Sequence, residues 1–266
     1  MKKIFIAGCT LLSVSLVQGQ LKEGKVTYER TLQMQIRIND MPGGMESQLP
    51  RTRTNKFELT FGNNQSLWKA AEQENDNDNV VSGDGMQIRM IVPGTDDVLY
   101  TNFTTGTSVE ERDVMDKKFI IDDSIRPLKW KMTGETKTIL NMPAMKATAT
   151  NISTRMTMNM DNGKMERKEV QDTANITAWF TSNIPVSAGP AEYQGQLPGL
   201  ILEMDVNNGR QVFKATSITE KADLAVIKQP TGKKHYTPAE FRKEREKMME
   251  EMQKNNQGGN RVIRMN

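Results

Sequence analysis

Residues 26–38 read VTYERTLQMQIRI, and this stretch decides the fold class of the chain. Every second residue from Val26 onward is apolar or aromatic except Arg30, and every residue in between is polar. Side chains of a β-strand alternate between its two faces. The pattern therefore predicts a long strand with one buried face and one solvent-exposed face.

The same alternation returns along most of the chain, in the runs 57–61, 86–92, 200–206 and 224–226. Such regular, short runs are typical of all-β proteins. We expect an all-β fold of roughly ten strands, joined largely as an antiparallel meander that forms a curved sheet, half-barrel or barrel, with one C-terminal α-helix.

Two Asn-Gly pairs indicate hairpin turns, because Asn-Gly supplies the positive φ angles of a type I′ turn. Asn162-Gly163 follows a predicted strand at 150–160 and precedes one at 164–171. Asn208-Gly209 stands in the same way between 200–206 and 211–218.

Two segments break the alternation and are expected to be loops. Residues 40–55 are rich in Gly and Pro, and residues 72–85 are rich in Asn, Asp and Gly. We expect a single β domain. The predicted segments are a signal peptide (1–19), an antiparallel β domain with a Leu-Pro-Gly turn (20–228), and a C-terminal helix with a flexible tail (229–266).

The C-terminal helix has a clear start. Thr237 is a suitable N-cap, Pro follows it at the first helical position, and Glu240 completes a capping box. We expect the helix to run from Pro238 to Lys254. Its apolar face is expected to consist of Phe241, Met248, Met249 and Met252.

The N-terminus reads as an export signal. Lys2 and Lys3 precede an apolar run at residues 4–17, and cleavage near Gly19 fits the side chains there. The run is too short to span a bilayer. An alternative is a lipoprotein anchored through Cys9, but the apolar run continues past that residue. We expect an exported protein, soluble in the periplasm or secreted, with no transmembrane segment.

Composition argues against several chemistries. His235 is the single histidine and Cys9 the single cysteine, so neither a Ser-His-Asp site nor a multi-His or Cys metal site is expected, and no cofactor. Loss of Lys2 and Lys3 lowers the basic count from 36 to 34 against 33 acidic residues, a net charge of +1. The sequence contains no basic stripe interleaved with aromatic residues, so we do not expect the protein to bind nucleic acid.

The 19 methionines are unusual in number. Met156, Met158 and Met160 would share one face of a strand, and thioethers suit Cu(I). The preferred interpretation is a methionine-rich core, because Met fills irregular apolar gaps and others (Met34, Met86, Met90, Met132, Met145 and Met204) also occupy apolar strand positions.

Residues 176–204 read ITAWFTSNIPVSAGPAEYQGQLPGLILEM: a strand, a loop with three prolines, and a second strand. We interpret the loop as a stiff crossover that packs apolar residues into the core; the alternative is a rigid lip of a binding site. Pro198-Gly199 suits a type II turn. Gln196 is expected at the surface, where replacement by Gly has little effect.

This stretch resembles the hallmark of the GLPGLI family of exported bacterial proteins, with Gln196 at the place of the family's first Gly. The start of the mature chain, Lys146-Ala147 and the end near Phe241 resemble it more weakly. The resemblance implies an exported β-protein and no reaction. The family-motif loop comprises Trp179, Pro185, Gly189, Pro190, Leu197, Pro198, Gly199, Leu200 and Ile201.

Three functions stay open. The first is a non-enzymatic exported β-protein that binds an apolar ligand or a protein partner, such as another exported or outer-membrane protein, on its sheet. The second is a periplasmic Cu(I)-binding protein that uses the methionine strand. The third is a carboxylate-dependent hydrolase, for which Glu203 and Asp205 lie on one strand face.

Overall fold

The computed structural model describes residues 21–33, 51–72, 80–83, 86–89, 94–115, 117–161 and 164–257. Within them, twelve strands form one sheet in the order β14-β8-β7-β6-β3-β2-β1-β13-β12-β11-β10-β9, and β4 pairs with β5 separately. Neighbours in the sheet are antiparallel except β14 and β8. The predicted all-β class is confirmed, and in the described part of the chain the sheet is open, with β14 and β9 at its edges.

The strands are β1 (Gly24–Gln33), β2 (Thr52–Gly62), β3 (Gln65–Ala70), β4 (Val80–Gly83), β5 (Met86–Arg89), β6 (Val98–Asn102), β7 (Thr107–Val114), β8 (Lys117–Ser124), β9 (Lys131–Ile139), β10 (Met142–Asp161), β11 (Lys164–Thr181), β12 (Leu200–Val206), β13 (Gln211–Thr219) and β14 (His235–Tyr236). The helices are the 3-10 turns η3 (Ala191–Tyr193) and η4 (Leu224–Val226), and α1 (Pro238–Gln257).

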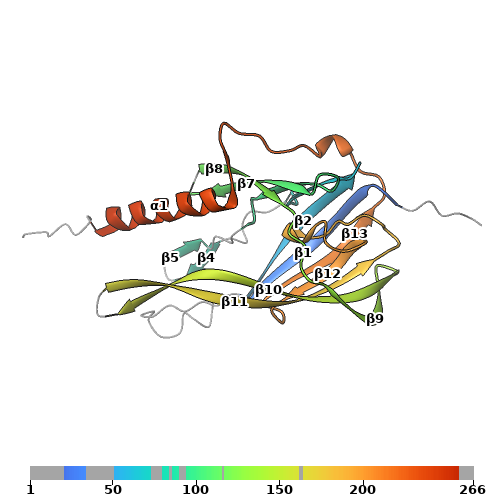
Figure 1. Cartoon of the computed structure of the whole chain (residues 1–266), viewed down its shortest axis with the longest axis horizontal. Helices are drawn as coiled ribbons and strands as arrows, with labels where there is room; N and C mark the ends of the chain where they lie inside the picture. Colours follow the sequence, from blue (N-terminus) through green and yellow to red (C-terminus); the bar gives the residue numbers. More distant parts are fainter. Residues whose placement is uncertain are drawn as a thin grey trace, which may run out of the picture.

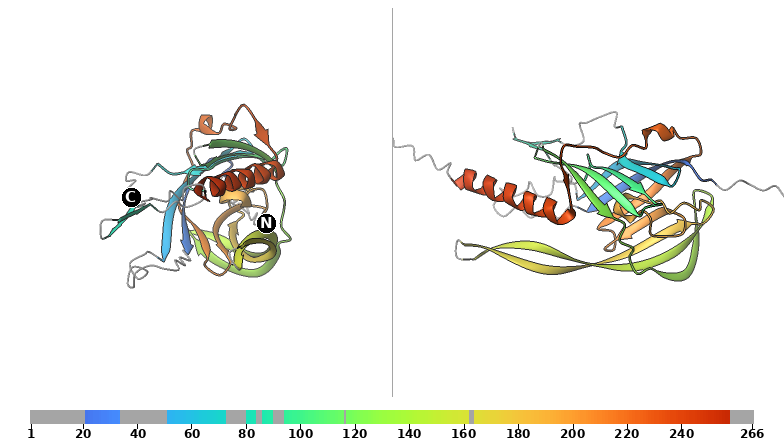
Figure 2. Two further views of the ribbon diagram at one scale, coloured as in Figure 1. Left: turned by 90° about the vertical axis from the view of Figure 1, so that its left-hand side faces the viewer. Right: turned by 45° about the horizontal axis from the view of Figure 1, so that its top comes forward.

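The sheet is strongly curved, as Figure 1 and Figure 2 show. It bends around the segment between β11 and β12, which lies inside the curve. We call this concave side the inner face. The helix α1 lies across the inner face at one edge of the sheet, where it packs on β8. Beyond the body of the sheet, β10 and β11 continue as a two-stranded ribbon.

The main core lies on the inner face, as the alternation in β1 predicts, and a smaller cluster of Leu67, Tyr100, Val109 and Ile120 is buried separately. Val26 and Tyr28 are fully buried, and Phe57 and Leu59 of β2 stand opposite them on the same face. Residues 34–38 of the predicted first strand, like the predicted signal peptide, lie outside the described residues.

The proline-rich loop fills the concave side of the sheet. Ile184, Ala188, Tyr193 and Leu197 are buried in the same cluster as the strand residues. The hydroxyl of Tyr28 donates a 2.5 Å hydrogen bond to the carbonyl oxygen of Ile201, which ties the end of the loop to the middle of the sheet. We call this loop between β11 and β12, residues 182–199, the plug, because it supplies much of the core.

Both predicted hairpins form, and their connecting loops differ in length. β10 and β11 pair as far as Asp161 opposite Lys164, so residues 162–163 connect them and lie outside the described residues. β12 and β13 close at Val206 opposite Gln211. Their connection is a four-residue loop with positive φ at Asn207, Asn208 and Gly209, rather than a two-residue type I′ turn. The Asp205 carboxylate accepts from Gly209 N at 2.7 Å and supports this longer loop.

Two predicted loops partly form strands. β2 begins at Thr52, inside the expected 40–55 loop, because pairing with β1 continues as far as Gln33. β4 occupies residues 80–83 of the expected 72–85 loop and pairs with β5. Residues 34–50, 73–79 and 84–85 lie outside the described residues.

The C-terminal helix begins where its capping box predicts and ends at Gln257 rather than Lys254. Thr237 N donates to the Glu240 carboxylate at 2.8 Å, and Glu240 N donates to Thr237 Oγ1 at 3.3 Å. Phe241 and Met248 are buried against β8. Met249, predicted on the same face, is 41% exposed, because a 100° step carries it past the narrow contact with the sheet.

Candidate functional site

The apolar lining of the inner face gives way to polar residues one step beyond Tyr28 and Phe57. The next residues on that face are Arg30 of β1 and Asn55 of β2, which lie directly opposite each other in the register. Arg30 is 7% exposed and Asn55 is 5% exposed. Two polar side chains are therefore buried side by side at the end of the core.

The Arg30 guanidinium is held by contact with an aromatic ring more than by hydrogen bonds. Its Cζ lies 4.5 Å from the centre of the Phe57 ring, and that ring stacks on Trp68 with centroids 4.9 Å apart. Nη1 makes a long bond of 3.4 Å to the carbonyl oxygen of Gly94. Among the described residues, Nε and Nη2 of Arg30 have no hydrogen-bond partner, and neither has Oδ1 of Asn55.

Further charged residues surround this pair. Arg112 of β7 places Nε 3.1 Å from Asp97 Oδ2 and Nη2 2.5 Å from Glu110 Oε1. We call Arg30, Asp97, Glu110, Arg112 and Glu192 the inner charged cluster. It holds two guanidinium groups and three carboxyl groups.

Burial shifts the pKa values of the cluster. It lowers the pKa of Arg30 to about 10, with Asp97 and Glu192 opposing the change, so Arg30 stays charged at neutral pH. It raises the pKa of Asp97 to about 6, although Arg112 pulls that pKa down. Burial also opposes the charge of Arg112, but Glu110 and Asp97 outweigh it and raise the Arg112 pKa. Arg112 is thus the cation that the carboxylates neutralise.

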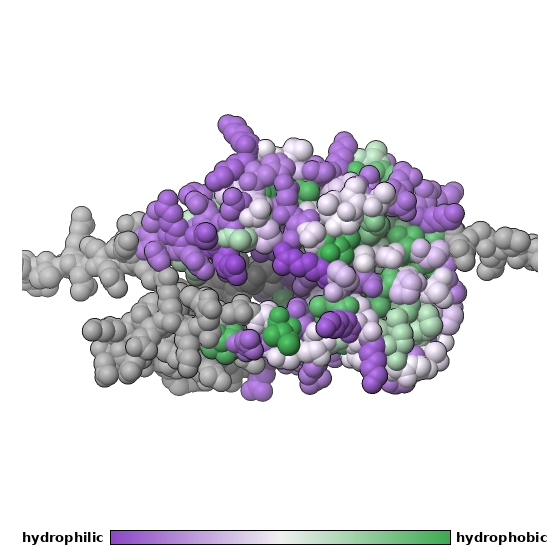
Figure 3. All heavy atoms as spheres, in the orientation of Figure 1, coloured by the Kyte–Doolittle hydropathy of each residue, from purple (hydrophilic) through white to green (hydrophobic). Residues whose placement is uncertain are grey.

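Two other elements border the inner charged cluster. The first turn of α1 reaches it, because Arg112 Cζ lies 5.4 Å from the Phe241 ring centre. The plug brings in Glu192 on η3; the residue is exposed as a whole, but burial of its carboxyl group raises the pKa of Glu192, with Glu110 adding to the rise and Arg112 and Arg30 opposing it. Figure 3 shows the surface hollowed below α1.

Polar side chains of the plug fix its position. The hydroxyl of Ser66 on β3 donates to Gln194 Oε1, and Gln194 Nε2 donates to the carbonyl oxygen of Ala191. Gln196 Oε1 accepts from Leu128 N at 3.0 Å and from Trp130 Nε1 at 3.1 Å. Gln196 thereby joins the plug to the segment that leads into β9. This differs from the isolated surface position expected from the sequence.

The family-motif loop is distributed over three environments. Trp179 is half-buried, and Pro185 and Pro198 are exposed. The remaining residues are buried, namely Gly189, Pro190, Leu197, Gly199, Leu200 and Ile201. The turn at Pro198 differs from the expected type II turn, because Gly199 N bonds the Leu197 carbonyl, an i to i+2 contact, and Gly199 has φ +157°.

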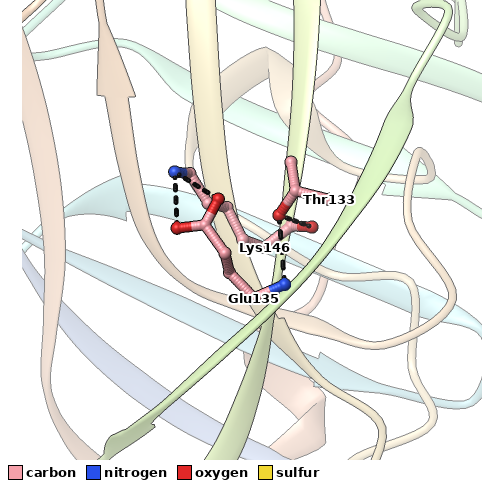
Figure 4. Close-up of polar contacts among 3 residues, drawn as sticks. All are labelled: Thr133, Glu135 and Lys146. Carbon is pink, nitrogen blue, oxygen red and sulfur yellow. Dashed lines mark hydrogen bonds and ion pairs between the residues drawn. The ribbon is translucent and has the colours of Figure 1, made fainter.

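Trp179 lies among lysines and carboxylates on the other side of the sheet. Lys137 Nζ is 4.3 Å from a Trp179 ring centre and 2.9 Å from Glu203 Oε1. Lys146 Nζ is 5.8 Å from the ring and bonds both oxygens of Glu135 at 2.9 and 3.0 Å. Figure 4 shows this pair between β9 and β10.

The charged side chains around Trp179, on the outer face of the sheet, form ion pairs with one another. The bond from Lys146 lowers the pKa of Glu135. Thr133 Oγ1 donates to the Lys146 carbonyl oxygen and accepts from Glu135 N, which links the two strands further (Figure 4). Glu203 is likewise paired with Lys137, and its strand neighbour Asp205 supports the next turn. The two carboxylates considered for hydrolysis thus have structural partners.

The methionines fall into different environments. Met204 is fully buried, but Met132 is 51% exposed and Met145 is 38% exposed, so the expected core position is wrong for these two. Both residues lie where β10 pairs with the edge strand β9, and their thioethers are at the surface there. β10 contains Met156, Met158 and Met160; their side chains, and those of Met34, Met86 and Met90, lie outside the described part.

Metal-ligand clusters and membrane-spanning helices are both absent from the described residues. These residues contain no group of three or more His, Cys, Asp or Glu side chains placed to hold a metal ion. They also contain no helix that combines the length and the apolar character needed to cross a bilayer. The single histidine, His235, is exposed, with Nδ1 2.9 Å from the Asp122 carboxylate.

Part of the chain matches a known protein family. A family model described as a protein of unknown function (Porph_ging) matches residues 130–203. No curated protein matches the chain. Two solved structures of PNGF-II are similar: one in space group C2, with 18% identity and a TM-score of 0.47, and one in P21, with 16% identity and a TM-score of 0.48. The alignments cover 81% and 84% of this chain, but 30% and 32% of the PNGF-II chains.

Sequence reasoning did not find the inner charged cluster. Its members come from β1, the segment before β6, β7 and η3, which are far apart in sequence. One signal was available: Arg30 occupies an apolar position of an otherwise regular alternation. A buried, charged residue in such a position needs a partner, and this rule could have singled it out.

Proposed function

We propose that this chain is an exported, non-enzymatic binding protein that holds a ligand, or a group of a protein partner, at the inner charged cluster. The observation that carries the proposal is Arg30, a charged side chain with 7% exposure and two nitrogens without partners among the described residues. Buried charges are normally paired, and leaving one unpaired costs several kcal/mol. A bound group that supplies the missing partners accounts for Arg30 at this place.

The plug narrows the choice between an apolar ligand and a charged one. The apolar part of the inner face is already covered by Ile184, Ala188 and Leu197. An apolar ligand would have to displace this loop, which Tyr28 and Ser66 anchor. The inner charged cluster offers buried hydrogen-bonding atoms without partners among the described residues, so we favour an occupant with a charged group.

The family match agrees with a chain that has no known reaction, because the matched family is one of unknown function. The matched residues 130–203 include the whole family-motif loop, and this loop carries the resemblance to the GLPGLI family. We therefore propose that residues 1–19 are removed on export and that Cys9 carries no lipid.

The rival functions gain less from the structure. Glu203 and Asp205, which a carboxylate-dependent hydrolase would need, are bound to Lys137 and to the β12–β13 loop. The side chains of Met156, Met158 and Met160, which Cu(I) binding would need, lie outside the described part of the chain.

Mass spectrometry of the protein isolated under native conditions from the cell envelope of its host tests the proposal. We expect a chain that starts near Gln20 and carries a stoichiometric bound molecule or partner chain. The variant Arg30→Leu, isolated in the same way, should lack it. The same bound species on both proteins, or none on either, contradicts the proposal, and an acylated Cys9 contradicts the proposed export route.

A further inference from the structure

The two nitrogens of Arg30 that have no partner in the described part of the chain define what can bind. Nε and Nη2 lie on one edge of the planar guanidinium group, and their N–H bonds point the same way. This edge matches the two oxygens of a carboxylate, which it can bind through two parallel hydrogen bonds. The contact between Arg30 Cζ and the Phe57 ring holds the guanidinium in place without using the Nε and Nη2 atoms of this edge.

Asn55 adds a second requirement. It stands opposite Arg30 on the neighbouring strand, where Cβ atoms are about 5 Å apart, and its Oδ1 also lacks a partner among the described residues. An amide oxygen accepts hydrogen bonds. The ligand must therefore offer a donor close to the group that Arg30 binds.

The surrounding charges select among anions. Asp97, Glu110 and Glu192 lie near the two guanidinium groups, so the inner charged cluster has a formal charge of −1 when all are ionised. A dianion suffers twice the repulsion of a monoanion at the same distance from these carboxylates. The cluster thus favours a singly charged planar anion over phosphate. Neither Asp97 nor Glu192 makes a hydrogen bond to Arg30 in the described part of the chain, so the edge is not already occupied by them.

From these observations we infer that the Nε–Nη2 edge of Arg30 binds a ligand carboxylate whose neighbouring atom carries an N–H or O–H donor for Asn55. This inference rests on the proposed function and adds the chemistry of the ligand. A peptide C-terminus and a small hydroxy acid both have this chemistry. The probes N-acetylglycine and glycolate represent these two sources.

The side-chain Nε–H signal of Arg30, followed by NMR of the ¹⁵N-labelled protein, tests the inference. The signal is assigned from its loss in Arg30→Lys. Titration with N-acetylglycine, glycolate, acetate and inorganic phosphate at equal ionic strength should give a saturable shift with the carboxylates, in the millimolar range expected for such small probes. We expect N-acetylglycine or glycolate to bind several-fold more tightly than acetate, and phosphate about tenfold more weakly. The stronger of the first two identifies the source.

Variants separate the two contacts. Arg30→Lys keeps the charge but loses the edge, so it should lose saturable binding of all carboxylates, as judged from backbone amide shifts near β1. Asn55→Ala should reduce the best probe to the affinity of acetate, and it serves as the test if Arg30→Lys does not fold. Arg210→Lys, at an exposed arginine, should behave as the wild type.

Three results overturn the inference: phosphate binding as tight as carboxylate binding, undiminished binding to Arg30→Lys, or no saturable shift with any carboxylate. These results are distinguishable from failure of the proposed function. If native mass spectrometry shows a bound species that Arg30→Leu loses while these titrations fail, the cluster binds a ligand of another class.

Discussion

The guanidinium of Arg30 lies 4.5 Å above the ring of Phe57, and the other partner of that ring is Trp68. The three side chains come from adjacent strands, β1, β2 and β3, and form a stack on the inner face. This stack explains how a charged residue is tolerated at the end of the core. The ring offers the cation a favourable contact, worth roughly 0.5–2 kcal/mol, without using the nitrogens on the edge of the guanidinium.

The raised pKa of Asp97 predicts a pH dependence of stability. Its pKa is about 6 in the folded protein and 3.8 without burial, so the folded state holds the proton more firmly. The stability that Asp97 contributes is full below pH 4 and is lost as the pH rises through about 6. Asp97→Asn should therefore gain about 1–3 kcal/mol of unfolding free energy relative to the wild type between pH 4 and pH 7.

Urea unfolding of both proteins across this pH range measures the difference. A wild-type protein that gains stability over Asp97→Asn as the pH rises would show that the ion pair with Arg112, rather than burial, controls the Asp97 carboxyl.

Gly199 permits a close approach of two backbone segments. A Cβ atom at this position would lie 2.2 Å from the carbonyl oxygen of Thr181, and its φ of +157° is unusual for other residues. Gly199→Val should therefore destabilise the fold by about 1–3 kcal/mol or more, measured by urea unfolding. Gly106→Val is the control, because Gly106 also has positive φ but a Cβ there would have no atom within 4 Å. Equal losses at the two glycines would rule out the steric explanation.

Gln196 should stabilise the fold, although the residue is only half-buried. It binds Leu128 N and Trp130 Nε1, so Gln196→Ala is expected to cost about 1–2 kcal/mol in unfolding free energy. A double-mutant cycle with Trp130→Phe isolates the side-chain bond, and we expect a coupling of about 0.5–1.5 kcal/mol. Simple additivity of the two changes would show that Gln196 and Trp130 act independently.

Adjacent methionines on α1 offer a matched pair. Met248 is 7% exposed and packs on β8, whereas Met249 is 41% exposed. Met248→Ala should lower the unfolding free energy by about 1–3 kcal/mol, and Met249→Ala should change it by less than about 0.5 kcal/mol. If both changes lower the unfolding free energy equally, the helix does not pack on the sheet through Phe241 and Met248.

Local patterns predicted the elements whose signals are local. The strand Leu200–Val206 has the predicted bounds, because apolar residues at every second position are followed by Asn and Gly. The helix start at Pro238 follows from the Thr237–Glu240 capping box, which the structure contains. The helix continues past its predicted end at Lys254 to Gln257, since helix ends are weakly specified by sequence.

Features that depend on distant contacts could not be predicted. β14 has two residues, too few to show any period, and its parallel pairing with β8 depends on the path of the chain before α1. Met132 and Met145 are more exposed than predicted, because alternation does not tell whether a face is covered. The partners of Arg30 and Arg112 are set by which strands neighbour β1 and β7, and this order is not encoded in any single segment.

The central claim is that Arg30 serves a ligand rather than the fold, and the unfolding free energy of Arg30→Leu in the ligand-free protein tests it most directly. Arg30→Leu removes a buried cation whose Nε and Nη2 have no hydrogen-bond partner among the described residues, so we predict a gain of about 1–3 kcal/mol in urea unfolding. A loss of that size would show that Arg30 stabilises the fold, and would contradict the account.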